Sequence, residues 1–534
     1  MNVSPARLVL PAVLGLLLAA LPAAAQVNFD AQPTGFLTAG TGGFPADAWN
    51  GTSMATAKTL VSALPAAPRS RALRDLQFKV LVSALNPPRP DGGPPPSLFA
   101  RRVEKIAAMG EGESLNEMVR NANGYADPAV AAVTANALLM AGARDSGCAI
   151  VRSHPLAEPF GARAQAACRL AAGDMAGALD AANTARASDP GFARMIEAVA
   201  TGQSAAGAAP TTVDGPAMVA MDLAHVPPGP NLIRSTQPPM IRSLVAQRSL
   251  PIATRVDIAE RGEALAVIEA SRLGDLYADA LREGASLPAA TARRARLVTA
   301  AKSASNEAEI MRTIADVYAE SRGSPLFPTI ARASAIGLVN LPANPKYAAV
   351  AVQAMRGFLL LGDKARTQAW TRLALDAARN NARAQLAIDR QMPLVALAGL
   401  DNPQSLPITE FDRWYEMFKE EDAARAALRG YVLLELLRAT GLDIPRGATS
   451  LPEAAPGGVR LVMPNGATLQ SLAASAAGRR IAETAVLAPI AAGEIALNEL
   501  HPAGAAAIVR ALRQIGEEET ARLFAVEVAI AYGI

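Results

Sequence analysis

Residues 161–190 read GARAQAACRLAAGDMAGALDAANTARASDP, and this stretch decides the predicted fold. Its small and apolar residues recur at helical spacing on both sides of Gly173-Asp174. Glycine enters the left-handed region without a Cβ penalty, so Gly173 predicts the end of a first helix. Asp174 is a favoured N-cap residue for a second helix, which Asp189-Pro190 ends. The stretch therefore predicts a hairpin of two short helices.

Small residues stand where the two helices of this hairpin must approach closely, at Ala166, Ala178 and Ala185. Their spacing, with Pro190 at the exit, resembles the hairpin of tetratricopeptide (TPR) repeats. The resemblance does not extend to the large positions of the repeat, since Ala162 and other non-aromatic residues occupy them. It implies an architecture of stacked helices and carries no chemistry of its own.

Weaker copies of the hairpin follow at Gly362-Asp363 and at Gly516, and Gly274-Asp275 gives a further Gly-Asp turn signal. The three Gly-Asp signals keep no constant period, which excludes a regular array. We therefore predict an all-α fold, an irregular TPR-like helical-repeat superhelix (α-solenoid) in two or three lobes. One small β-hairpin is predicted at 459–472, because Asn465-Gly466 is a strong hairpin-turn signal.

The composition supports the helical prediction. The chain has 534 residues, of which 51% are hydrophobic and only 4% aromatic, so its apolar content is mainly Ala, Leu and Val. Alanine has the highest helix propensity of all residues. A net charge of +3 is close to zero for this length and gives no electrostatic footprint for nucleic acid.

Composition also divides the chain into segments. Proline-rich residues 86–97 and the Gly/Ala/Ser/Pro-rich residues 201–230 are predicted to be linkers, because such stretches do not continue a helix. The predicted organisation is a signal peptide at 1–25, an irregular and helical segment at 26–96, a helical lobe at 97–200, a flexible linker at 201–230, a helical-repeat lobe at 231–400 and a C-terminal lobe at 401–534.

The first 25 residues resemble a secretory signal peptide. Arg7 is the positively charged residue, residues 8–21 are the apolar stretch, and Ala23-Ala24-Ala25 precede a cleavage site before Gln26. No later run reaches the ~18 apolar residues that a membrane span needs. We expect an exported protein without a membrane span, located in a bacterial periplasm.

The two cysteines, Cys148 and Cys168, lie 20 positions apart in neighbouring predicted helices. In an oxidising compartment such a pair predicts a structural disulfide. Two free buried thiols are the alternative. Neither a CxxC motif nor a nearby ligand cluster suggests redox chemistry or metal binding.

An aromatic stripe at i, i+3, i+4 and i+7 is formed by Phe411, Trp414, Tyr415 and Phe418. This spacing places all four side chains on one face of a helix. Packing in the core is one interpretation. A partner-binding surface is the other, because Trp and Tyr are common hot-spot residues of protein interfaces.

Glu320-Ser321, followed by residues 334–342, resembles the Glu-Ser and Gly-Leu-Met-Gln elements of lytic transglycosylases. The resemblance implies that Glu320 is a general acid for glycosidic cleavage, which requires a pKa raised by burial. The second element departs from the family at Val339-Asn340. Residues 51–56 (GTSMAT) also resemble the nucleophile motif of subtilisin-like proteases, but no histidine precedes Ser53.

No stretch of the sequence indicates a cofactor or a metal site. We expect a non-enzymatic periplasmic scaffold or adaptor that binds protein partners of a cell-envelope assembly, such as a flagellar motor, secretion or export machinery. A peptidoglycan-acting lytic enzyme and a lipid or small-molecule carrier are the alternatives. The overall texture also resembles Ala/Pro-rich secreted proteins of alphaproteobacteria, a resemblance that implies no activity.

Overall fold

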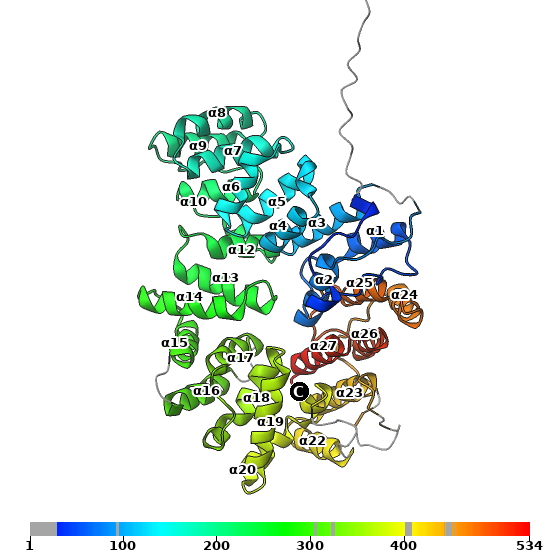
Figure 1. Cartoon of the computed structure of the whole chain (residues 1–534). Helices are drawn as coiled ribbons and strands as arrows, with labels where there is room; N and C mark the ends of the chain where they lie inside the picture. The colour runs from blue at the N-terminus through cyan, green and yellow to red at the C-terminus, as the bar shows by residue number, and fades with distance from the viewer. Residues whose placement is uncertain are drawn as a thin grey trace, which may run out of the picture.

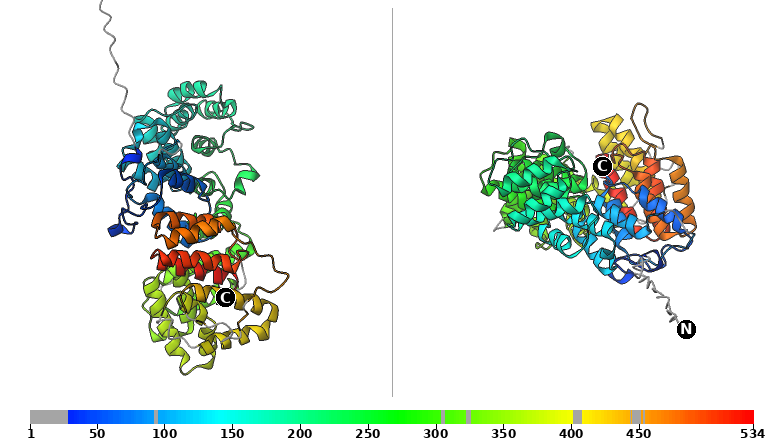
Figure 2. Two further views of the ribbon diagram at one scale, coloured as in Figure 1. Left: turned by 90° about the vertical axis from the view of Figure 1, so that its right-hand side faces the viewer. Right: turned by 90° about the horizontal axis from the view of Figure 1, so that it is seen from above.

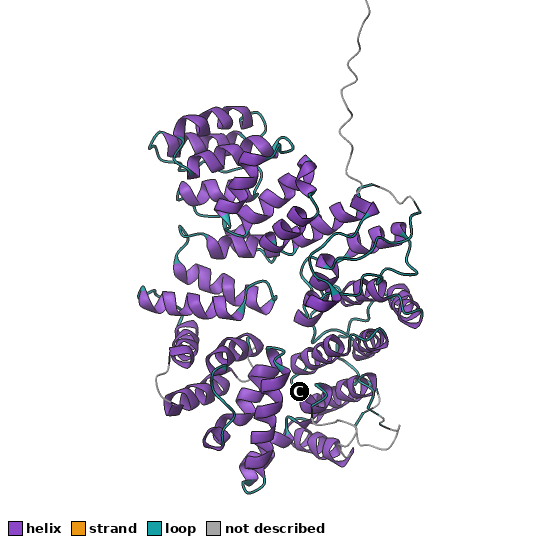
Figure 3. Cartoon of the chain, in the orientation of Figure 1, coloured by secondary structure: helices purple, strands orange, loops and turns teal. Residues whose placement is uncertain are grey.

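The computed structural model describes residues 29–91, 95–303, 307–321, 326–400, 408–442, 444, 451–452 and 454–534. Over these residues all regular secondary structure is helical, with 27 α-helices, five short 3-10 helices and no strand (Figure 3). The predicted all-α class is confirmed. The predicted signal peptide at 1–25 lies outside the described residues.

The first described segment carries three α-helices, each with a serine N-cap. They are preceded by η1 (Phe29–Ala31) and η2 (Ala39–Thr41) and comprise α1 (Met54–Ala63), α2 (Arg71–Val82) and α3 (Leu98–Ala108). Ser53, Ser70 and Ser97 each accept a hydrogen bond from the backbone N–H three residues later. Such caps satisfy N–H groups that lack a partner within the helix. The Ser53 motif that resembles a protease nucleophile is therefore a helix start.

A side branch of helices follows α3 and returns to it, forming the upper part of Figure 1. It comprises α4 (Gly112–Asn121), η3 (Gly124–Ala126), α5 (Pro128–Met140), α6 (Arg144–Ser153), α7 (Phe160–Ala171), α8 (Met175–Ala185), α9 (Pro190–Ala200), α10 (Gly215–Leu223), α11 (Pro230–Ile233) and α12 (Pro238–Ala246). From α4 to α9 each helix packs on the next, whereas α10 packs back on α5 and α7, and α12 on α3 and α5.

The next helices continue down the side drawn in green in Figure 1. They are α13 (Ile252–Ala264), α14 (Ala270–Arg282), α15 (Ala289–Ser303), α16 (Glu307–Ser321), α17 (Phe327–Ala335), η4 (Ile336–Leu338), η5 (Pro345–Val350), α18 (Ala351–Leu360), α19 (Lys364–Ala378) and α20 (Ala382–Asp389). Each α-helix from α12 to α19 packs on the one that follows it.

The last helices bring the chain back to its beginning. They are α21 (Met392–Leu397), α22 (Ile408–Glu421), α23 (Ala423–Ala439), α24 (Gly466–Ala477), α25 (Ile481–Ala492), α26 (Pro502–Gln514) and α27 (Glu518–Ala531). Helix α25 packs on α1 and α2, and α27 packs on α2, α21 and α23. The helices therefore form a closed circuit in which the first and last elements lie side by side (Figures 1 and 2).

Polar contacts accompany this packing between the first and last helices. Buried Thr52 donates a hydrogen bond from Oγ1 to Glu483 Oε2 over 2.8 Å. Lys79 Nζ on α2 lies 2.8 Å from Glu517 Oε1, just before α27. The segment before residue 97 and the C-terminal lobe, which composition separates, thus share one packed core.

The hairpin at 161–190 has the predicted local structure. Helix α7 ends before Gly173, whose φ is +80°, and the Asp174 side chain accepts from Gly177 N at the start of α8. Asp189 caps α9, with Pro190 as its first residue. The small residues at the helix contact are fully or almost fully buried: Ala166 (0% exposed), Ala178 (0%) and Ala185 (1%).

The other glycine turn signals differ in outcome. Gly362 and Gly516 have φ values of +73° and +88° and end helices as predicted. The prediction of a turn at Gly274 is wrong, because this glycine lies inside α14. Its neighbours Leu273 and Tyr277 are buried at helical spacing, so packing of this face keeps the helix continuous.

The segment 201–230, predicted as a flexible linker, contains a packed helix. Residues 217–221 of α10 are all buried, and Asp214 caps the helix with Pro216 in its first turn. The proline marks a helix start, where its missing N–H costs nothing, rather than a boundary. A Cβ on Gly191 would lie 1.7 Å from Ala209 O, so the preceding coil also runs directly against α9.

The predicted β-hairpin at 459–472 is absent from the structure. Asn465 is the N-cap of α24 and accepts a hydrogen bond from Thr468 N, so Asn465-Gly466 begins a helix instead of a turn. The extended residues before it make one isolated parallel bridge, between Val462 and Leu500. Asparagine is as favourable at an N-cap as in a turn, and the helical pattern after residue 466 decides between them.

Candidate functional site

Five charged side chains from four distant parts of the chain meet near the middle of the circuit. Arg71 and Asp75 lie on α2, Glu263 on α13, Arg332 on α17 and Glu527 on α27. We call these five residues the central ion cluster. It is the candidate functional site because Glu263 and Arg332 are buried charges, and charges with shifted pKa values gather at sites that bind or switch.

Glu263 is the best-buried member, with no exposed surface. Its two carboxylate oxygens accept from Arg332 Nε and Nη2 over 2.6 and 2.7 Å, a bidentate pair. Arg71 Nη2 donates to Glu263 Oε1 over 3.0 Å and to its backbone oxygen over 3.2 Å. Burial raises the pKa of Glu263, but the two guanidinium groups outweigh burial and hold that pKa below its usual value. The triad joins α2, α13 and α17.

Glu527 lies on the last helix and caps the start of α2. Ser70 Oγ donates to Glu527 Oε2 over 2.5 Å, and Ala72 N donates to Oε1 over 3.1 Å. A carboxylate at a helix N-terminus is normally stabilised by the free N–H groups there. Burial nevertheless dominates and raises the pKa of Glu527. The closed circuit thus makes this carboxyl group hold its proton to a higher pH than an exposed glutamate would.

Asp75 and Glu527 both line a cavity of about 50 Å³ between α2, α27 and the end of α18. Leucines 359–361 and Gly362 form the other wall. Asp75 has exposed surface in this recess, but the surrounding protein desolvates its carboxylate and raises its pKa. Arg71 acts in the opposite direction. The recess has room for a few water molecules, through which the two acids can exchange protons with solvent.

A second shared carboxylate lies beside the cluster. Glu111 Oε1 accepts from Arg74 Nη2 and from Arg242 Nη2, each over 2.7 Å. These contacts join α2 to the start of α4 and to α12. Glu111 also lies close enough to Asp75 to raise its pKa. The cluster is therefore continuous with ion pairs that connect α2 to the side branch.

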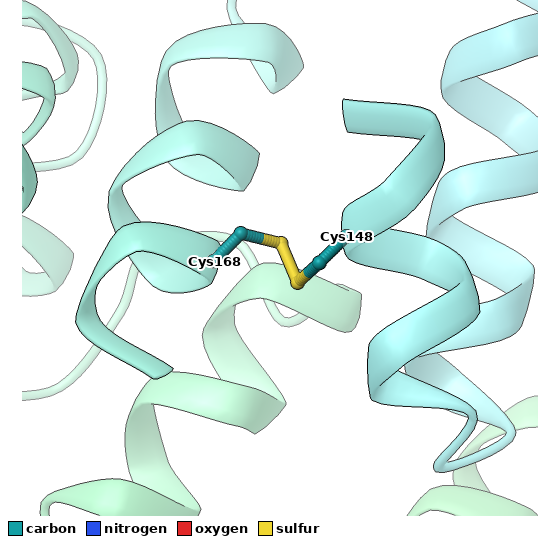
Figure 4. Close-up of a disulfide and its surroundings, with 2 residues drawn as sticks. All are labelled: Cys148 and Cys168. Atoms are coloured by element: carbon teal, nitrogen blue, oxygen red, sulfur yellow. A yellow bond between two sulfur atoms is a disulfide. The ribbon is translucent and has the colours of Figure 1, made fainter. Parts of the chain in front are cut away.

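The predicted disulfide is present. Cys148 on α6 and Cys168 on α7 are bonded, with a Cα–Cα distance of 5.4 Å (Figure 4). Both residues are 4% exposed. The bond joins the hairpin at 161–190 to the helix before it and lies outside the central ion cluster.

The aromatic stripe lies in the core. Phe411 and Trp414 on α22 are 1% and 0% exposed, and Tyr415 and Phe418 are 9% exposed. Arg390 and Arg429 lie over the Phe418 ring, 5.4 and 4.9 Å from its centre. Their burial favours core packing over an exposed partner surface. Helix α22 ends at Glu421, because Asp422 caps a new helix, α23.

Glu320, the candidate general acid, belongs to the last turn of α16, and its side chain lies outside the described residues. Over the described part of the chain, no group of three His, Cys, Asp or Glu residues is arranged to hold a metal ion. In the same residues no helix is long and apolar enough to cross a membrane.

No pattern in the sequence predicted the central ion cluster. Its members are separated by up to several hundred residues and form no local motif. One signal was visible: Glu527 is the lone charged residue of the apolar run LFAVEVAIA, residues 523–531. A lone charge at this position on an amphipathic helix predicts a buried partner. No protein-family model, curated protein or solved structure was found to match the chain.

Proposed function

We propose that the protein is an exported, non-enzymatic scaffold whose irregular TPR-like surfaces bind a protein partner of a cell-envelope assembly. One observation carries this proposal: from α12 to α19 each α-helix packs on the next. Nearest-neighbour stacking of this kind is typical of helical-repeat proteins, which use their extended surfaces to bind peptides and helices. Flagellar motor, secretion and export assemblies are candidate settings by analogy of fold alone.

Export to the periplasm is part of the proposal. The Cys148–Cys168 disulfide supports it, because such bonds persist in oxidising compartments and are rare in the cytosol. Mass spectrometry of the protein recovered from a periplasmic fraction tests it. We expect a mature chain that begins at Gln26, and a chain that retains the residues before it contradicts signal-peptide cleavage.

Partner binding is tested by crosslinking in intact cells, followed by purification of the protein under denaturing conditions. Four large apolar side chains of the described residues are notably exposed: Met175 (41%), Leu386 (47%), Val459 (41%) and Met463 (49%). Val459 and Met463 belong to one extended segment, whereas Met175 and Leu386 lie on distant helices. A Val459→Ser/Met463→Ser variant tests the exposed segment, and a Met175→Ser/Leu386→Ser variant, which also removes two exposed apolar side chains, tests the other two positions. We expect a reproducible adduct that one double variant loses, and no adduct with any variant or the parent contradicts the proposal.

The enzyme alternative has its own experiment. The purified protein and its Glu320→Gln variant are incubated with peptidoglycan, and soluble muropeptides are measured by mass spectrometry. We expect no release by either protein. Release that depends on Glu320 would contradict the non-enzymatic proposal. Native mass spectrometry of the same preparation tests the carrier alternative, because a carrier retains its ligand.

A further inference from the structure

The central ion cluster lies where α2 and α27 face α13 and α17. We call this contact the boundary, and it differs from the other helix contacts of the circuit. Helix α2 packs closely on α25 and α27, and its buried residues Leu73, Leu76 and Val80 are apolar. Across the boundary, by contrast, α2 meets α13 through Arg71 and Glu263, and no close helix packing joins the two. Opening an apolar interface costs a free energy of about 25 cal/mol for each Å² of apolar surface that becomes exposed to water. Ion pairs instead exchange for hydration when they separate, so the contact between α2 and α13 depends on charges rather than on buried apolar area.

We propose that the central ion cluster is a proton-controlled latch, which joins α2 and α27 to α13 and α17 and loosens when Asp75 and Glu527 are both ionised. The latch is independent of the scaffold function proposed above. Its closed form is the Arg71–Glu263–Arg332 triad seen in the structure. The latch is controlled by competition for Arg71, between Glu263 on one side and the pair Asp75 and Glu527 on the other.

Arg71 faces three carboxylates at once. It is hydrogen-bonded to Glu263, and its charge also acts on Asp75 and on Glu527. While Asp75 and Glu527 are protonated, Glu263 is the one ionised carboxylate that attracts it. When both acids ionise, they attract Arg71 toward the cavity and repel Glu263. Arg332 remains paired with Glu263 on the far side of the boundary, so the break falls between α2 and α13.

Further charged groups lie around Asp75 and Glu527. From α17, Arg332 faces Glu527, and at the start of α14, Glu269 faces Asp75 and Arg332. From α2 and α4, Arg74 and Glu111 face Asp75. The wall formed by residues 359–362 of α18 and the side of α21 toward α27 are apolar.

The sign of the pH effect follows from the direction of the pKa shifts. The pKa values of Asp75 and Glu527 are raised in the closed protein, from reference values of 3.8 and 4.5. The closed form therefore binds more protons than an open form with ordinary acids, and closure weakens as pH rises above those reference values. The pKa of Glu263 is lowered from its reference value of 4.5. Its contribution to the stability of the closed form is therefore lost only as the pH falls below 4.5. The latch should be tightest in mild acid.

Electron paramagnetic resonance distances between two spin labels test the latch in the full mature chain. Asp257→Cys on α13 and Arg510→Cys on α26 place exposed labels on either side of the boundary. The native cysteines do not react because they are disulfide-bonded. As the pH is raised stepwise above the reference values of 3.8 and 4.5, we expect the interspin distance to lengthen and its distribution to broaden. The Asp75→Asn/Glu527→Gln double variant should keep the short distance throughout.

Two further variants make the outcome decisive. Glu519→Gln removes one exposed charge from the same helix, α27, and should behave like the parent protein. Arg71→Gln removes the group for which the carboxylates compete and should give the long distance at every pH. The proposal is overturned if the interspin distance in the parent protein does not change with pH. It is also overturned if the distance shifts equally in the parent and in the double variant. If the double variant fails to fold, a parent-like distance in Arg71→Gln overturns it.

Discussion

Ser70 Oγ donates a hydrogen bond to Glu527 Oε2 over 2.5 Å, although 457 positions separate the two residues in the sequence. The contact joins the N-cap of an early helix to the last helix of the chain. It is one of several contacts that make the first and last elements a single packed unit. The stability of the circuit therefore depends on residues that are remote in sequence.

Removal of the disulfide should destabilise the hairpin that decides the fold. Closing a loop of 20 residues contributes about 3 kcal/mol, mainly by restricting the unfolded chain. The Cys148→Ser/Cys168→Ser variant should lose this amount in urea unfolding, and amides of α6 to α9 should exchange faster. An unchanged midpoint, or loss of protection spread evenly over all helices, contradicts the prediction.

Replacing Glu263 should leave Arg332 charged and unpaired in the interior. Loss of one partner of a buried ion pair typically costs 3–5 kcal/mol, so Glu263→Gln should lower the free energy of unfolding by about 3 kcal/mol. The matched control is Asp376→Asn, because the Arg379–Asp376 pair is 77% and 63% exposed. Exposed pairs contribute at most about 1 kcal/mol. Similar losses in the two variants would show that the triad is not a buried ion pair in solution.

Asp189 should give the protein an acid-sensitive element. This buried carboxylate accepts from the backbone N–H groups of Phe192, Thr211 and Thr212. Burial raises its pKa, but the hydrogen bonds, that from Thr211 first, outweigh burial and lower the pKa below 3.8. Its contribution is therefore present above pH 3.8 and is lost as pH falls through the lowered value.

The test of this element compares the parent protein with Asp189→Asn. Asparagine has one acceptor oxygen and no charge, so the variant should lose about 2 kcal/mol near neutral pH. The difference should shrink as the pH is lowered below 4, because the parent then loses its charge as well. A difference that stays constant between neutral and acid pH contradicts the assignment.

A methyl group at residue 191 should be poorly tolerated. A Cβ there would lie 1.7 Å from Ala209 O, which is backbone and must move for the side chain to fit. Gly191→Ala should cost about 2 kcal/mol in unfolding free energy, as overpacking usually does. Gly229→Ala is the control, since nothing lies within 4 Å of a Cβ at that position. Equal stability of both variants would mean that residues 201–214 do not pack on α9.

Local features of the fold were predictable, because each depends on a few neighbouring residues. The turn at Gly173, the cap at Asp174 and the disulfide pair were all evident in the sequence. The errors at Gly274 and Asn465 arose where one residue type suits two local structures and packing selects one of them.

The central ion cluster was not predictable for a different reason. The cluster forms only when distant helices pack together, and no spacing of residues in the sequence predicts that packing. Its members include Arg71, Glu263, Arg332 and Glu527. The burial of the aromatic stripe that begins at Phe411 was predictable in part. Its spacing placed the aromatic side chains on one face, but what covers that face depends on the tertiary structure.

The pairing of α2 with α25 and α27 has a consequence for the order of events during biogenesis. A chain made from its N-terminus contains α2 long before its partner helices exist. Closing a flexible loop of 457 residues costs about 3 kcal/mol more than closing one of 20. That difference falls away once the intervening helices have folded and hold the ends near each other. We therefore expect the apolar face of α2 to be the last part of the molecule to lose its contact with water, and the newly made chain to need protection there until α27 has formed.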